Sequence, residues 1–389
     1  MVEWTECSLE EIGEIIGGAT PSTKREDYYG GSIPWITPKD LSSFEGRFIS
    51  RGERNITDEG FRSCSTKMLP KGAVLFTSRA PIGYVAIASQ SVCTNQGFKS
   101  VVTNERADPL FVYYLLKHNR EYIERLGSGT TFKEVSGKVM QSVKVRIPQD
   151  VHYQKKIASI LDSLDSQIET NKQINDNLQQ QAFSVFDNLI TNAENNDCTV
   201  SDYALLNPKR TLAKKQVARS IDMSQLSTSG AFPSGWEMKP FNGGMRFTNG
   251  DTLLARITPC LENGKTAFID FLDDGEVAFG STEYIVLAPK NDTPPEMLYC
   301  LARHPAFVDY AVKNMNGSSG RQRVSAETVG QYRLPLVDKH CLVLFKEVVS
   351  PMFLKMRYNS LENMRLADLR DALLPKLMSG EIDVSEVKL

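Results

Sequence analysis

The sequence predicts a duplicated architecture in which a globular domain and a long helix occur twice, in the order domain, helix, domain, helix. Three observations predict this fold class. The chain of 389 residues exceeds the roughly 100 to 200 residues of an ordinary domain. The stretch 150–189 recurs at 338–377, a constant offset of 188 positions. Both copies place mostly apolar residues at the spacing of a coiled coil, so we expect two paired rods of about 60 Å each.

In each copy, a series of mostly apolar residues is spaced alternately by four and three positions, which is the 3.5-residue period of a two-stranded supercoil. We call this series the seam of the helix. In the first copy they are Ile157, Leu161, Leu164, Ile168, Asn171, Asn175, Leu178, Ala182, Val185 and Leu189. In the second they are Phe345, Val349, Met352, Met356, Asn359, Asn363, Leu366, Arg370, Leu373 and Leu377. Arg370 breaks the pattern once, and Pro375 is expected to end or kink the second helix near Leu374.

Two asparagines interrupt the first seam and two interrupt the second at the same positions. Asn171 and Asn175 align with Asn359 and Asn363. Asparagine inside such a seam lowers stability and fixes register, so we expect the two pairs to meet and to hold the helices in one alignment. An approximate two-fold between the halves makes the helices antiparallel. The alternative is that each helix merely covers its own domain.

The helix boundaries follow from capping signals. Asp150 and Asp338 each follow a proline closely and are expected to be N-caps. The predicted segments are a first domain over 1–149, a helix over 150–192, a second domain over 193–337, a helix over 338–380 and a tail over 381–389.

The two globular segments resemble each other more faintly. Residues 72–79 and 250–256 both indicate a turn and a mostly apolar strand that ends in arginine. A Gly/Ser-rich loop follows in each half, at 127–136 and at 317–325.

Composition and motifs indicate a binding protein and no catalyst. Lys and Arg number 45 against 47 Asp and Glu, a net charge of -2, so any nucleic-acid interface must be a local basic face.

The seven cysteines are scattered and predict neither disulfides nor a metal site. The segment around Gly264, Lys265 and Thr266 lacks the first glycine of a phosphate loop, and 292–296 lacks the aromatic residue of an amino-methyltransferase loop. Without a membrane span or a leader signal, we expect a cytoplasmic protein.

Three motifs resemble the specificity subunits of type I restriction-modification systems. They are an opening with Trp4, 17–22 and 28–36, a second-domain core at 250–265, and a carboxy-terminal signature at 369–382. The resemblance covers nearly the whole chain. It implies two α/β target recognition domains, at 1–149 and 193–337, separated by an antiparallel coiled coil.

This resemblance also implies a function without chemistry in this chain. Such a subunit reads a bipartite, asymmetric site in double-stranded DNA. It positions two modification subunits, which methylate adenine with S-adenosylmethionine, and recruits restriction subunits that use ATP and Mg. No cofactor, metal or membrane is expected to bind this chain. The alternative is a coiled-coil adaptor with two ligand-binding domains and no DNA role.

Basic residues in loops are the candidate DNA contacts, because arginine can read guanine and lysine neutralises phosphate. The candidates are Lys24, Arg25, Lys39, Arg79, Lys133, Lys209, Arg210, Lys214, Lys215, Arg256, Arg321 and Arg323. Apolar residues outside the seam are candidates for docking the partner subunits, or alternatively widen the intramolecular core. These are Ile160, Phe183, Phe186, Val348 and Leu374.

Overall fold

The computed structural model describes residues 2–42, 44–129, 133–318 and 320–387, with the side chains of 194–197 left aside. The chain divides into two compact units. Unit 1 comprises residues 1–166 and 367–389, and unit 2 comprises 167–366. Each unit therefore contains one globular part and a portion of both long helices.

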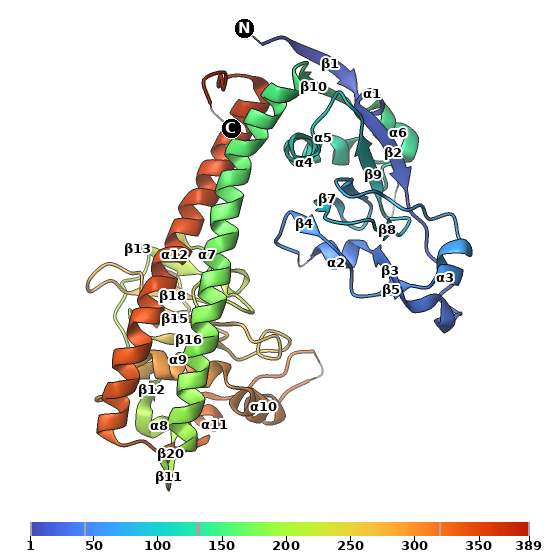
Figure 1. Cartoon of the computed structure of the whole chain (residues 1–389). Helices are drawn as coiled ribbons and strands as arrows, with labels where there is room; N and C mark the ends of the chain where they lie inside the picture. The colour runs from blue at the N-terminus through green and yellow to red at the C-terminus, as the bar shows by residue number, and fades with distance from the viewer. Residues whose placement is uncertain (1, 43, 130–132, 319, 388–389) are drawn as a thin grey trace. The chain divides into compact units, whose positions relative to one another are not determined.

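The long helices are α7 (Val151–Thr191) and α12 (Lys339–Ser379), drawn in green and in red in Figure 1. Both begin at the expected caps, because Asp150 accepts a hydrogen bond from the amide of His152 at 2.8 Å and Asp338 accepts one from the amide of His340 at 2.7 Å. The mixed α/β fold class with two long helices is confirmed.

Pro375 does not end the second helix, so the predicted end near Leu374 was wrong. Helix α12 continues to Ser379. A proline inside a helix costs about 3 kcal/mol, but Leu377 and Met378 beyond it are buried in the core of unit 1. Their burial offsets the missing hydrogen bond.

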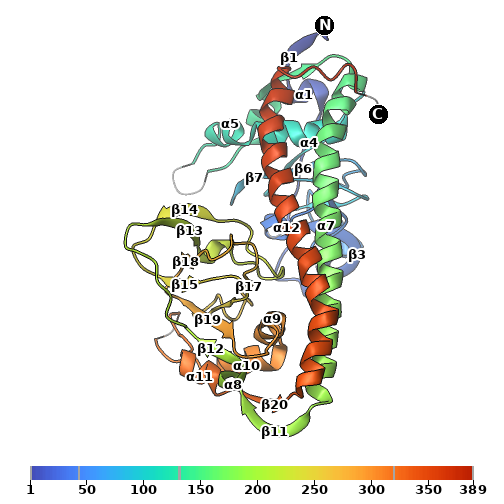
Figure 2. The ribbon, with the colours of Figure 1, turned by 90° about the vertical axis from the view of Figure 1, so that its left-hand side faces the viewer.

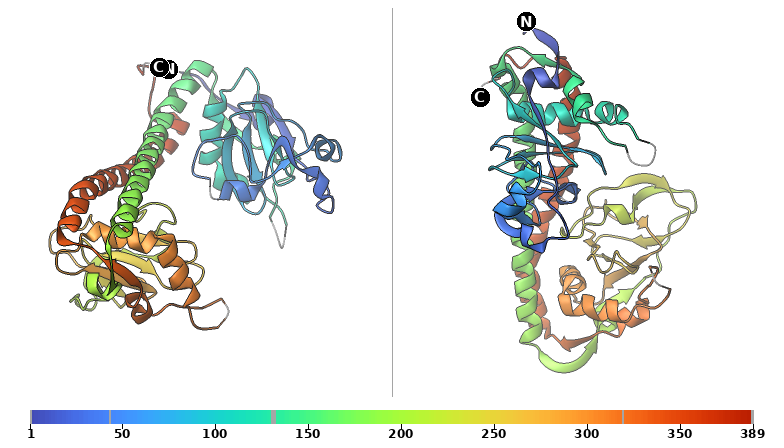
Figure 3. Two further views of the ribbon diagram at one scale, coloured as in Figure 1. Left: turned by 60° about the horizontal axis from the view of Figure 1, so that its bottom comes forward. Right: turned by 90° about the vertical axis from the view of Figure 1, so that its right-hand side faces the viewer.

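A five-stranded sheet forms the centre of unit 1 (Figure 3). Its order is β2 (Gly13–Gly17), β9 (Lys99–Thr103), β6 (Val74–Ser78), β7 (Ile82–Ala88) and β4 (Phe48–Ile49). A smaller sheet contains β5 (Asn55–Ile56), β3 (Tyr29–Ile36) and β8 (Cys93–Thr94). The strand pair β1 (Trp4–Ser8) and β10 (Lys144–Pro148) leads into α7.

The described residues of unit 2 form a related arrangement, with four strands in the main sheet and four in the second sheet (Figure 2). Its main sheet has the order β12 (Ala204–Leu206), β19 (Tyr284–Pro289), β16 (Thr252–Ala255) and β17 (Thr266–Phe268). Its second sheet contains β14 (Glu237–Pro240), β13 (Val217–Ile221), β18 (Ala278–Gly280) and β15 (Met245–Phe247), and its strand pair is β11 (Glu194–Thr199) with β20 (Arg333–Leu336).

Short helices complete both globular parts. In unit 1 they are α1 (Leu9–Ile12), η1 (Glu26–Tyr28), α2 (Pro38–Ser42), α3 (Asp58–Arg62), α4 (Pro109–His118), α5 (Arg120–Arg125) and α6 (Gly137–Ser142). In unit 2 they are α8 (Val200–Tyr203), η2 (Met223–Gln225), α9 (Pro295–Arg303), α10 (Pro305–Lys313) and α11 (Ala326–Gly330).

Helices α4 and α9 fill the space between the main sheet and the long helices of their own unit. Residues 111–116 of α4 and 296–302 of α9 are buried. Strand residues alternate between two cores, as a pleated strand requires: Phe76 packs with α4 and with Ile157 of α7, whereas Leu75 packs on the opposite face of the sheet. Each globular part is thereby fixed to its helices by a continuous hydrophobic core.

Among the residues that the structure describes, no helix combines the length and the hydrophobicity that crossing a lipid bilayer requires.

Candidate nucleic-acid interface

Basic loop residues occur at corresponding places in the two globular parts. Strands β3 and β13 correspond, because each pairs in parallel with a short strand, β8 in unit 1 and β18 in unit 2. Along the chain, β8 follows the antiparallel pair β6–β7 and β18 follows the antiparallel pair β16–β17. Lys24 lies shortly before β3, and Lys209, Lys214 and Lys215 lie shortly before β13. All four side chains are exposed. The topology therefore presents cationic side chains from one equivalent loop in each unit.

Several candidate contacts in unit 1 are held by acidic neighbours. Arg25 forms an ion pair with Asp27 at 2.5 Å, and Lys39 forms one with Glu53 at 2.8 Å. Arg79 lies 3.5 Å from Glu134. Lys39 is largely exposed, so its pair contributes little to stability and can open toward a phosphate.

Arg210 has a structural role in unit 2. Its guanidinium contacts the carboxylate of Asp251, which is almost completely buried and also accepts a hydrogen bond from the amide of Thr248 at 2.8 Å. Burial raises the pKa of Asp251 to about 6, although Arg210 and the Thr248 amide oppose the rise. This pair fixes the loop that carries Lys209 against strand β16.

Arg323 is likewise occupied within unit 2. Its guanidinium donates to both carboxylate oxygens of Glu283, at 2.7 to 3.0 Å. Arg256, whose backbone amide donates to the carbonyl of Glu283, keeps a buried Nε without a partner in the described part of the chain. Arg321 is exposed at the end of the neighbouring loop. Of this cluster, Arg321 is therefore the side chain placed for an external anion.

The ion pairs found among the described residues leave seven of the candidates outside them. Arg256 is half-buried, and the other six are exposed, namely Lys24, Lys133, Lys209, Lys214, Lys215 and Arg321.

Two arginines that were not among the sequence candidates lie beside the same loop of unit 1. Arg51 and Arg54 line an open, polar hollow of about 560 Å³ together with Tyr29 and Asn55. Both arginines are exposed. The local sequence Arg51-Gly52-Glu53-Arg54, a basic turn around glycine, was the available signal for them.

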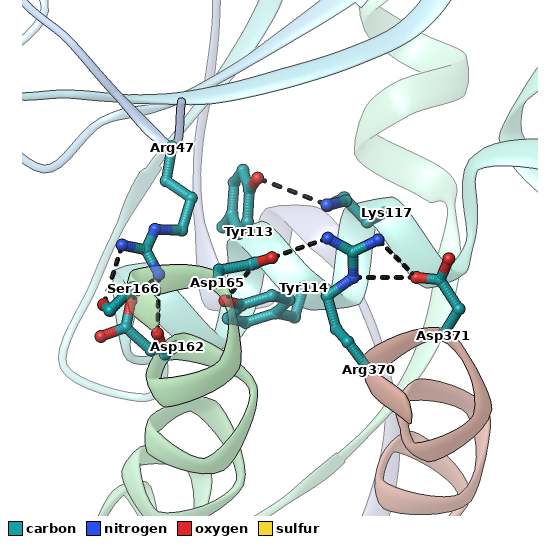
Figure 4. A network of polar contacts seen from close by, with 9 residues as sticks. All are labelled: Arg47, Tyr113, Tyr114, Lys117, Asp162, Asp165, Ser166, Arg370 and Asp371. Carbon is teal, nitrogen blue, oxygen red and sulfur yellow. Dashed lines mark hydrogen bonds and ion pairs between the residues drawn. The ribbon is translucent and has the colours of Figure 1, made fainter. Parts of the chain in front are cut away.

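A polar network fixes the first globular part to the long helices of unit 1 (Figure 4). Asp165 of α7 accepts hydrogen bonds from Tyr114 of α4 at 2.8 Å and from Arg370 of α12 at 2.7 Å. Arg47, just before β4, donates to the carbonyl of Asp162 at 2.8 Å and to Ser166 at 3.0 Å. Arg370, which interrupts the heptad pattern, is therefore paired and not left as an isolated charge.

Unit 2 has a corresponding attachment. Tyr299 of α9 donates to Gln179 of α7 at 3.0 Å, and both side chains are buried. Arg357 of α12 donates to the carbonyl of Asp270 at 2.9 Å. In both units, a tyrosine of the short buried helix, α4 or α9, and an arginine, Arg47 or Arg357, connect the globular part to the long helices.

The four asparagines lie opposite one another within unit 2. Asn171 donates to Asn363 at 3.0 Å, and Asn359 donates to Asn175 at 2.8 Å. Asn175 also donates to Ser360 at 3.2 Å. Because the partners run in opposite directions along the two helices, the helices are antiparallel in this unit.

The apolar docking candidates differ in accessibility. Phe186 is 1% exposed and belongs to the core of unit 2, so its proposed role as a docking residue was wrong. Phe183 stacks on Tyr299, and Ile160 and Leu374 pack against the core of unit 1. Val348 is 48% exposed. Only Val348 of these five presents a largely free apolar surface.

Comparisons with known proteins agree on one family. Residues 1–180 match the type I restriction modification DNA specificity domain. The MjaIX specificity subunit of Methanocaldococcus jannaschii is 29% identical over 99% of this chain and 95% of its own length. The EcoR124I/EcoR124II specificity subunit of Escherichia coli is 31% identical over 42% of this chain and 41% of its own length. The crystal structure of the S subunit of a type I restriction-modification system from M. genitalium has a TM-score of 0.58 and 18% identity, covering 97% of this chain and 96% of that one.

Proposed function

Because the chain belongs to the family of type I restriction-modification specificity subunits, we propose that its two globular parts each read one half of a bipartite, asymmetric DNA site. The chain is a DNA-recognition subunit and not itself an enzyme. The similar proteins give no support to an adaptor without a DNA role.

One observation carries the proposal of two half-sites. The main sheets of the two units share an order of four strands, β2-β9-β6-β7 and β12-β19-β16-β17, to which unit 1 adds β4, while their loops carry different residues. A common scaffold with different loops is the arrangement expected for two readers of different sequences. The site should therefore be asymmetric.

The loop chemistry suggests how the halves differ. In unit 1, Arg51 and Arg54 offer planar guanidinium groups, which can donate two hydrogen bonds to guanine. In unit 2, Lys214 and Lys215 offer point charges that suit phosphate. We assign base reading in unit 1 to the arginines and backbone anchoring in unit 2 to the lysine pair.

The paired helices would set the separation of the half-sites. Two readers on one face of B-DNA must be about one helical turn apart, roughly 34 to 36 Å, or a multiple of it. Each helix of 41 residues extends about 60 Å at 1.5 Å per residue. The asparagine contacts of unit 2 would keep that spacing constant.

The partners in this proposal are two modification subunits and the restriction subunits of the same system. S-adenosylmethionine, ATP and Mg would bind to those partners. Within the described residues, no group of histidine, cysteine and carboxylate side chains is arranged to hold a metal ion.

Mapping of methylated adenines tests the proposal. The chain would be co-expressed with the modification subunit encoded beside it, and a random DNA library would be methylated by the purified complex and sequenced by a single-molecule method. We expect one two-part motif with a constant spacer. A stable complex that methylates without any motif, or that leaves all DNA unmethylated, would contradict sequence recognition by this chain.

A further inference from the structure

An apolar groove lies in unit 2 where the end of α7 meets the start of α12. Its volume is about 800 Å³, and its lining includes Leu189, Cys341, Leu344, Phe345 and Val348. Leu344 is 47% exposed and Val348 is 48% exposed. Adjacent aliphatic side chains that are half exposed on one helix form a surface that a further element could cover.

The internal repeat identifies the matching surface in unit 1. The offset of 188 positions places Cys341, Leu344, Phe345 and Val348 on Tyr153, Lys156, Ile157 and Ile160. In unit 1 this surface is covered by the chain's own tail, residues 381–387, which follow the end of α12.

The tail is held there by apolar and polar contacts. Val384 is 1% exposed, and Ile382 and Val387 pack against the same core. The amide of Val384 donates to the hydroxyl of Tyr153 at 3.1 Å, and that hydroxyl donates to Asp383 at 3.1 Å. Lys156 donates to the carbonyl of Ser385 at 2.5 Å. Unit 1 thus shows what kind of segment this surface accepts.

In unit 2 the same offset places the tail on residues 193–199, and the backbone there forms strand β11, which pairs with β20. Helix α7 ends at Thr191, and the chain enters strand β11 at Glu194, so only two residues separate them. The described part of the tail is already packed in unit 1. Neither segment is free to fill the groove, so the described residues of the chain supply no occupant for it.

We propose that the groove of unit 2 binds a short segment of a partner protein in the way that unit 1 binds the tail. The segment presents two aliphatic side chains separated by one residue, as Ile382 and Val384 are. Cys341 and Leu344 replace the tyrosine and lysine that hold Asp383 and Ser385 in unit 1. The partner segment is therefore more apolar than the tail and has an uncharged residue at the position of Asp383. This inference does not depend on DNA recognition.

Alkylation of Cys341 provides a local measurement, because this exposed thiol lines the groove. The full chain would be incubated with a synthetic peptide that has the sequence of residues 379–387 with Asp383→Leu. Alkylation at each cysteine would then be followed by peptide mass spectrometry. We expect the peptide to slow the reaction of Cys341 several-fold and to leave Cys64, which lies in unit 1, unchanged.

Two matched variants separate binding from folding. Leu344→Glu places a charge in the groove, whereas Val343→Glu places one on a neighbouring residue of α12 that is 51% exposed and does not line it. We expect Leu344→Glu to weaken peptide binding at least about tenfold and Val343→Glu to leave it unchanged.

A gain-of-function variant completes the test. Cys341→Tyr combined with Leu344→Lys rebuilds the surface of unit 1, so it should bind the unmodified tail peptide better than the Asp383→Leu peptide, as measured by fluorescence anisotropy. The proposal is overturned if neither peptide protects Cys341, or if protection survives Leu344→Glu. It is also overturned if the purified chain is a dimer that Leu344→Glu dissociates, since the occupant is then a second copy.

Discussion

Tyr114 of α4 donates a hydrogen bond of 2.8 Å to Asp165 of α7, and Arg370 of α12 donates to the other oxygen of the same carboxylate. One carboxylate thus joins the globular part of unit 1 to both long helices. Asp165 is 10% exposed at its side chain, so these hydrogen bonds are poorly replaced by water.

Asp165→Asn should lower the free energy of unfolding by about 2 kcal/mol, because the half-buried Arg370 loses one of its two charged acceptors and keeps only Asp371. Tyr114→Phe should cost about 1 kcal/mol. Tyr122→Phe, at a tyrosine that is 42% exposed, is the matched control and should change nothing. Urea unfolding with hydrogen exchange of residues 109–118 measures both effects. Unchanged exchange in α4 would refute the anchoring role.

Replacement of the asparagines should separate stability from register. Asn171→Leu alone leaves the side-chain oxygen Oδ1 of Asn363 without its donor and should destabilise unit 2 by about 1 to 3 kcal/mol. Adding Asn363→Leu should restore stability but permit shifted alignments or self-association. Thermal unfolding and light scattering check this. A double variant that stays monomeric with one alignment in cysteine cross-linking would contradict a register role.

The lysine pair before β13 should contribute electrostatically to DNA binding. In the complex with modification subunits, Lys214→Ala with Lys215→Ala should weaken binding to all sequences and reduce the slope of log affinity against log salt by about 2. Lys71→Ala, at an exposed turn on unit 1, serves as the control. An unchanged slope would remove the pair from the interface.

The arginines of the polar hollow should affect sequence choice. Arg51→Ala or Arg54→Ala should cost about 1 to 3 kcal/mol in discrimination at one base pair of one half-site, and the other half-site should keep its sequence. Motif mapping of the methylated library measures this. An equal loss at every position would indicate phosphate contacts instead.

The stability of unit 2 should depend on pH through Asp251. Burial raises the pKa of this carboxyl to about 6 in the folded chain, from an ordinary value of 3.8. The folded state therefore holds a proton that the unfolded state has lost between these two values, so the contribution of Asp251 to stability is present below pH 4 and is lost as the pH rises through 6. The loss is on the order of 3 kcal/mol.

Comparison with Asp251→Asn isolates this effect, because asparagine does not titrate. Between pH 4 and pH 6, the urea midpoint of the native chain should fall relative to that of the variant. Above pH 6, the difference between the two midpoints should stay constant. A constant difference across this range would contradict the raised pKa.

Sequence alone predicted the repeated helices and their caps, because these depend on local chemistry. Heptad spacing specifies a helix face wherever it occurs, and Asp150 and Asp338 cap the residues that follow them directly. The error at Pro375 shows the limit of local rules, since burial of Leu377 and Met378 in a distant core outweighs the local cost of proline.

Tertiary structure alone decided which charged residues are free. Arg210 and Arg323 are typical contact candidates by sequence, yet each is paired with a carboxylate that lies at least 40 positions away. It also placed Phe186 in the core and left Leu344 half exposed. The reason is physical: heptad periodicity and capping act between neighbours in the chain, whereas the pairing of a charge and the burial of a side chain depend on residues that only folding brings together.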